Sequence, residues 1–124
     1  MKRDLDLIRD ILLVAEAAKP EQRVALRDFE KLYPDRLEEV SDHVQLLDRV
    51  GLLDATISKA ISIKGPRAFV INRIEWAGHD YLDAVRDPGI WAKTQQQLKS
   101  VGGSATLEIV KAVAVKIISQ TLGV

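Results

Sequence analysis

The chain has 124 residues, which suits one domain with a terminal appendage and is long enough to bury a core. Its 18 basic and 18 acidic side chains cancel, so any affinity for nucleic acid or for an acidic membrane has to come from a local patch. It has no cysteine, which excludes disulfides, thiolate nucleophiles and cysteine-bound zinc and favours the reducing cytoplasm as its location.

The first predicted element is a helix from about Arg3 to Ala18. Its apolar residues recur at three- and four-residue intervals, and Asp4 and Asp6 lie near the positive end of the helix dipole. These acids also argue against a secretory signal, and no run approaches the roughly 20 apolar residues of a membrane-spanning helix. We therefore expect no membrane association.

The stretch from Glu21 to Tyr33 fits two patterns. Val24 and Leu26 alternate as in a short strand, whereas Leu26 and Phe29 also fit a helical face. We favour a short strand over about residues 23–28 followed by a turn, and the structure of the whole stretch stays open.

The segment from Asp35 to Leu53 predicts an amphipathic helix that runs directly into a strand. Asp35 and Glu38 have the spacing of a capping box, and Gly51 is suited to the left-handed conformation that ends a helix. The buried stripe is predicted to contain Leu37, Val40, Val44 and Leu47, and to be widened by Leu46 and Val50. A helix that passes into a strand in this way is typical of the third helix of a winged-helix domain.

A β-hairpin and a helical tail are predicted to follow. Residues 52–64 and 67–76 are rich in β-branched side chains and are separated by the turn dipeptide Gly65-Pro66. Helices are then expected over about residues 78–87 and 90–99, with Trp76 and Trp91 packed between hairpin and tail. A last helix, capped by Ser104 and ending near Leu122, is too apolar to lie uncovered on a small monomer.

Four blocks of the chain carry a resemblance to a known family. In order, they are MKRDLDLIRDILL, HVQLLDRVGLLDA, IEWAGHDYLDAVRDPGIW and GGSATLEIVKAVAVKI. They resemble a family of small bacterial and prophage proteins that is defined as a domain of unknown function, DUF2513. The resemblance implies a winged-helix-like domain with a C-terminal helical tail, and it implies no activity and no site residues.

The expected fold is therefore α+β and mostly helical. It consists of a winged helix-turn-helix-like domain with a β-hairpin wing over residues 1–87 and a C-terminal helical extension over residues 88–124. The extension is expected to pack on that domain or on a partner subunit.

No enzymatic chemistry can be assembled from the sequence. His43 borders the buried stripe and is interpreted as a packed histidine, and His79 with Asp80 is interpreted as a helix cap. No metal-ligand set, phosphate-binding loop or nucleophile motif is present in the sequence, so we expect no cofactor, no small-molecule substrate and no enzyme.

Two kinds of binding remain. The first is binding of double-stranded DNA, because residues 55–76 of the hairpin carry four basic residues against one acid, although the central segment over residues 35–54 is acidic. The acids of that helix oppose phosphate unless they read cytosine amino groups. Ser41 is a further helix residue that could reach bases, and the principal candidates are Lys59, Lys64, Arg67 and Arg73 on the hairpin and Arg36, Gln45 and Arg49 on the helix.

The alternative is a protein-interaction or homo-oligomerisation module without nucleic-acid binding. Its main support is the apolar last helix, which could form the interface of a homodimer. The residues predicted for this interface are Ile109, Val110, Val113 and Ile117.

Overall fold

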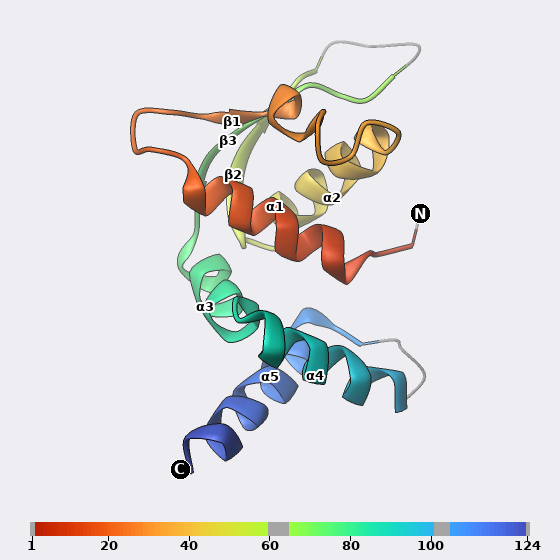
Figure 1. The fold of residues 1–124 in the computed structure, drawn as a ribbon. Helices are drawn as coiled ribbons and strands as arrows, with labels where there is room; N and C mark the ends of the chain where they lie inside the picture. Colours follow the sequence, from red (N-terminus) through yellow and green to blue (C-terminus); the bar gives the residue numbers. More distant parts are fainter. Residues whose placement is uncertain (1, 60–64, 101–104, 124) are drawn as a thin grey trace. The chain divides into compact units, whose positions relative to one another are not determined.

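The computed structural model describes residues 2–59, 65–100 and 105–123. These residues form an α+β structure whose chain divides into two compact units, Met1–His79 and Asp80–Val124. The boundary predicted from the sequence lies further along, between residues 87 and 88. Figure 1 shows the order of the elements along the chain.

The first unit begins with helix α1, Leu5–Ala17. The side chain of Asp4 caps this helix by accepting a hydrogen bond from the backbone N–H of Leu7, as expected of an acid at the positive end of the dipole. Leu7, Ile8, Ile11 and Leu12 of α1 are buried. The predicted helix over Arg3–Ala18 is thus confirmed, with slightly narrower bounds.

The ambiguous stretch forms a strand of only two residues, β1 (Val24–Ala25), followed by a short 3₁₀ helix, η1 (Leu26–Phe29). The carboxylate of Asp28 accepts a hydrogen bond from the N–H of Ala25, which turns the chain where the sequence predicted a longer strand. Phe29 is fully buried, and its ring centroid lies 6.0 Å from that of Phe69.

Helix α2 spans Leu37–Arg49. The predicted capping box of Asp35 and Glu38 is wrong: the N-cap residue is Arg36, and no side chain caps the helix. The reason is a turn in which the N–H of Arg36 donates to the carbonyl of Tyr33, so that Asp35 lies within the turn. At the other end, Gly51 has the predicted left-handed conformation, with φ of 79°.

The predicted hairpin is present as strands β2 (Leu53–Ile57) and β3 (Phe69–Ile74). They pair antiparallel with a register shift at Asp54 and Ala55, and β1 pairs antiparallel with the other edge of β3, giving the sheet order β1-β3-β2. Helices α1 and α2 contact each other and the sheet (Figure 1). The core of this unit is therefore formed between two helices and a small sheet.

Helix α3 spans Trp76–Val85 and starts two residues earlier than predicted. His79 and Asp80 lie inside it, so their predicted capping role is wrong. Trp76, predicted to be packed, occupies the first position of the helix and is 83% exposed, whereas Trp91 is buried. Gly78 lies so close to the chain before β2 that an added Cβ would be 1.9 Å from the carbonyl oxygen of Leu52.

The second unit contains helices α4 (Pro88–Ser100) and α5 (Leu107–Leu122), which pack on each other. Thr106 caps α5 by accepting a hydrogen bond from the N–H of Ile109 at 3.2 Å. The predicted cap at Ser104 is therefore wrong, and Ser104 itself lies outside the described residues. The residues of α5 that are buried are Val110, Ala114 and Ile117.

Candidate nucleic-acid interface

The outward side of α2 lies opposite its buried stripe. Val40, Val44 and Leu47 are buried, as the periodicity predicted. Leu37 and Leu46 are only half-buried, and the prediction for Val50 is wrong, because Val50 follows the last residue of the helix and is 61% exposed. Residues spaced four, three and four positions apart follow the opposite side of a helix, because each position advances by 100°. This outward row consists of Glu38, Asp42, Gln45 and Arg49, of which Gln45 is half-buried and the others are exposed.

The hairpin is tied to α2 through one buried hydroxyl group. The Oγ of Ser41 donates to the backbone carbonyl of Arg67 at 2.7 Å, and the Nε2 of Gln45 donates to the Oγ of Ser41 at 3.2 Å. Ser41 is only 1% exposed, so it cannot contact bases as the sequence analysis expected; instead it positions its neighbours. The structure thus brings together Gln45 and Arg67 from two elements.

The predicted hairpin cations differ in their surroundings. Lys59 and Arg67 are exposed, and neither forms a salt bridge with any described residue. Arg73, in contrast, donates to Glu75 at 2.7 Å and lies 3.8 Å from the carboxylate of Asp54. Lys64 lies outside the described residues. Of the predicted cations, Lys59 and Arg67 therefore have no carboxylate partner among the described residues, whereas Arg73 is neutralised within the hairpin.

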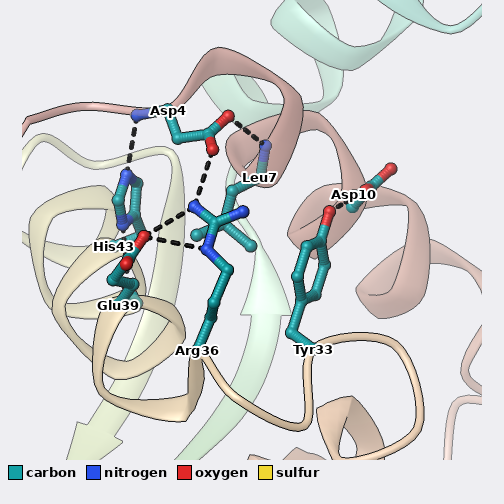
Figure 2. Close-up of polar contacts among 7 residues, drawn as sticks. All are labelled: Asp4, Leu7, Asp10, Tyr33, Arg36, Glu39 and His43. Carbon is teal, nitrogen blue, oxygen red and sulfur yellow. Dashed lines mark hydrogen bonds and ion pairs between the residues drawn. The ribbon is translucent and has the colours of Figure 1, made fainter.

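Arg36 is also neutralised, by carboxylates on both sides (Figure 2). Its Nη2 donates to Asp4 at 2.7 Å and to Glu39 at 2.6 Å, and its guanidinium lies 5.4 Å from the ring centre of Tyr33. The hydrogen bonds from Arg36 to Glu39 and then Asp4 raise the pKa of Arg36. Arg36 therefore joins α2 to the start of α1 and is not available to a phosphate.

The pKa of Asp4 reflects the same contact. Partial burial acts to raise it, but the hydrogen bonds from Arg36 and from the N–H of Leu7 outweigh burial and lower the pKa of Asp4 below its ordinary value. The charged carboxylate is thus the form that the folded protein stabilises.

His43 is fully buried and satisfied at both ring nitrogens. Its Nε2 accepts from the N–H of Asp4 at 2.9 Å, and its Nδ1–H donates to the carbonyl of Glu39 at 2.7 Å (Figure 2). These partners require the neutral ring with the proton on Nδ1. The interpretation of His43 as a packed histidine bonded to the backbone is confirmed.

Tyr33 and Asp10 form a second link between α1 and the turn before α2. The hydroxyl group of Tyr33 donates to the carboxylate of Asp10 in a short hydrogen bond (Figure 2). Burial, and then this bond and the charge of Asp10, raise the pKa of Tyr33. The sequence did not predict the contacts of Asp4 with His43 and Arg36 or the contact of Tyr33 with Asp10. These partners lie 23 to 39 positions apart, so no local spacing indicates them.

Two acids of α2 are engaged by other groups of the protein. Glu39 is paired with Arg36, and the carboxylate of Asp48 accepts a hydrogen bond from the N–H of Ala55 at 2.9 Å. The acids that remain on the outward row are Glu38 and Asp42, together with one cation, Arg49. The outward row therefore combines acceptors, an amide and a guanidinium.

The predicted interface residues of α5 are divided between its two sides. Val110 and Ile117 are 0% and 3% exposed and lie in the interior of this helix pair, Val113 is half-buried, and Ile109 is 49% exposed. Val115 and Leu122, which the sequence analysis did not select, are 44% and 69% exposed.

The described residues provide neither a metal-binding cluster nor a membrane-spanning helix. In residues 2–59, 65–100 and 105–123, no group of three or more histidine, cysteine, aspartate or glutamate side chains could hold a metal ion. Over the same ranges, none of the helices has both the length and the apolar character needed to cross a membrane.

Comparison with known proteins places the chain in a family. The family described as "Hypothetical protein (DUF2513)" matches residues 2–104. A protein of Haemophilus influenzae described as "Uncharacterized protein" is 33% identical over 122 residues, which are 98% of this chain and 99% of that protein. No solved structure is significantly similar. The chain therefore belongs to the DUF2513 family.

Proposed function

We propose that the protein is a non-enzymatic, winged-helix-like module that binds double-stranded DNA, with its hairpin as the wing that contacts the phosphate backbone. The observation that carries this proposal is the pair of exposed cations Lys59 and Arg67, which form no salt bridge with any described residue and lie on a hairpin tied to α2. Binding to duplex DNA in the cytoplasm of a bacterium would give such a module a regulatory role.

The order of the elements supports a winged-helix-like fold. Helix α1, the short strand β1, the turn with η1, helix α2 and the hairpin of β2 and β3 follow one another in the order typical of that fold. The sheet order β1-β3-β2 also agrees with it. In winged-helix proteins this arrangement commonly presents the helix before the hairpin to a groove and the wing to the flanking backbone. Because a fold does not by itself specify a function, the proposal depends on the exposed cations Lys59 and Arg67.

The electrostatic argument is local. A lysine or arginine that contacts a phosphate releases a bound counterion. The logarithm of the binding constant therefore falls with the logarithm of the salt concentration, with a slope of about 0.9 per contact. Lys59 and Arg67 can each make such a contact. Arg36 and Arg73 cannot do so without leaving their carboxylate partners. We therefore expect a shallow slope and modest affinity for DNA of unrelated sequence.

The test is the binding of a labelled duplex, measured by fluorescence anisotropy at about 50 and 200 mM salt. Arg67→Gln should weaken binding and reduce the salt slope by about one. Arg73→Gln is the matched control, because it removes a similarly exposed arginine of the same hairpin that is already paired, and it should change the slope little. If the parent does not bind at 50 mM salt, or if the two variants behave alike, the proposal is refuted.

Self-association through α5 is the second candidate. The observation that favours it is the exposure of Val115 and Leu122, which lie seven positions apart on one side of a helix whose buried side packs on α4. Exposed apolar side chains that gather on one helix are typical of an interface between subunits. A second copy of the chain is the partner in this proposal.

Light scattering after size exclusion, over a range of concentrations, tests self-association. Val115→Glu should convert dimers to monomers, whereas Lys116→Glu at the neighbouring exposed position should have a much smaller effect. A parent protein that is monomeric at every concentration would exclude this candidate.

A further inference from the structure

The outward row of α2 differs from the hairpin in chemistry. Its members, Glu38, Asp42, Gln45 and Arg49, lie along one side of the helix over about 16 Å, at 1.5 Å per residue. A surface that only attracts phosphate would be basic throughout, whereas this row contains acceptors, an amide and a guanidinium. Each of these groups matches the edge of a particular base.

Gln45 is the member of the row whose orientation the structure fixes. Its Nε2 donates one of its two hydrogens to the Oγ of Ser41, and Ser41 is itself held by the carbonyl of Arg67. One N–H and the carbonyl oxygen of the Gln45 amide remain uncommitted. One donor and one acceptor on a planar amide are the groups that bind N7 and N6 of adenine in the major groove. Since Ser41 is buried, the amide is oriented before any DNA binds, and less side-chain entropy is lost on binding.

The neighbours of Gln45 in the outward row, Asp42 and Arg49, match different bases. Asp42 precedes it by three positions, or about 4.5 Å along the axis, and an ionised carboxylate only accepts hydrogen bonds. In the major groove it is compatible with the amino group of cytosine and opposes bases that present acceptors alone. Arg49 follows by about 6 Å and matches O6 and N7 of guanine.

We infer that the outward row of α2 reads base edges in the major groove, with Gln45 as the residue that specifies adenine and Ser41 as the residue that positions it. This inference rests on the proposed DNA binding and adds a sequence preference to it. The preferred site contains an adenine, with cytosine on the side read by Asp42 and guanine on the side read by Arg49.

The experiment is selection from a library of randomised duplexes with the full chain, followed by affinity measurements on the selected site and on its adenine-to-guanine variant. The parent should select a site with a fixed adenine and prefer it roughly tenfold over the variant. Gln45→Ala should remove this preference, so that the selected site and its adenine-to-guanine variant bind with similar affinity. Gln45→Arg should move the preference from adenine to guanine.

Two further variants separate reading from folding. Gln96→Ala, at an exposed glutamine of α4, is the matched control and should leave the selected site unchanged. Ser41→Ala should lower the preference for adenine more than it lowers affinity for unrelated DNA, because it releases the Gln45 amide without removing it. Circular dichroism identifies any variant that has lost its fold, and Gln45→Arg tests the inference independently of Ser41→Ala.

The outcomes distinguish this inference from the proposed function. If the parent binds duplexes without any preference, or if Gln45→Ala selects the same site as the parent, the inference is overturned while DNA binding stands. If the parent retains no duplex at low salt, the proposed function fails and this inference with it.

Discussion

Replacing Gly78 with alanine tests the closest approach in the first unit. The added Cβ would lie 1.9 Å from the carbonyl oxygen of Leu52 and 2.7 Å from Cγ2 of Ile74, so the groups would have to separate by about 1.5 Å to reach an ordinary contact of 3.4 Å. The Leu52 carbonyl cannot move freely, because it accepts a hydrogen bond from the N–H of Glu75 at 2.9 Å. The start of α3 is thereby held against the chain that leads into β2.

The expected loss of stability follows from three contributions. Overpacking costs about 1–3 kcal/mol, and the weakened hydrogen bond to the Leu52 carbonyl costs about 1 kcal/mol. Alanine in place of glycine inside a helix returns about 1 kcal/mol. The free energy of unfolding should therefore fall by about 1–3 kcal/mol.

Urea denaturation followed by circular dichroism measures this change, with a slope of about 1–3 kcal/mol per molar urea. Gly89→Ala is the matched control, since that glycine also lies in a helix but its added Cβ would meet only a side-chain oxygen of Asp87 at 3.1 Å. It should stay within about 1 kcal/mol of the parent. If Gly78→Ala is as stable as Gly89→Ala, the close packing of α3 on Leu52 is refuted.

Three further predictions concern the polar contacts of α1. Arg36→Met should lower the free energy of unfolding slightly in dilute buffer and by less at 1 M salt, because salt screens its partly exposed pairs with Asp4 and Glu39. Equal losses at both salt concentrations would contradict this. Because the folded pKa of Asp4 is lowered, its stabilising contribution is present above the ordinary value of 3.8 and lost as pH falls below it; acid denaturation should therefore depend less on pH in Asp4→Asn than in the parent. Because the pKa of Tyr33 is raised, its contribution to stability is present below its ordinary value of 10.0 and lost as pH rises above it. The difference in absorbance titration near 295 nm between the parent and Tyr33→Phe should therefore be one phenol that ionises above pH 10.0, and a difference centred at pH 10.0 would contradict the contact with Asp10.

The elements that the sequence predicts well are those with a long periodic pattern. Helix α2 repeats its apolar stripe over three turns, and the hairpin has two β-branched runs around a turn dipeptide. Strand β1 could not be delimited, because a strand of two residues has no alternation to detect. The start of α2 was misplaced because the turn at Tyr33 competes with Asp35 for the same backbone, which local spacing does not reveal.

In the candidate site, too, the sequence predicts the local contacts and does not reveal the contacts between residues far apart in the chain. The spacing of Ser41 and Gln45 is local, and a helical wheel places them as neighbours. The partners of Arg36 and Arg73 decide whether these cations are available, and the contact between Arg36 and Asp4 joins residues 32 positions apart. Sequence counts of basic residues therefore overestimated the charge that the hairpin and α2 present to a ligand.

The bond from Ser41 to the hairpin ends on a main-chain oxygen. Any amino acid at position 67 has the same backbone carbonyl group. The hairpin can therefore keep its hydrogen bond to α2 with any side chain at that position. A neutral or acidic residue could therefore replace Arg67 without loss of this contact. The position of the hairpin on α2 is thus independent of the side chain at position 67.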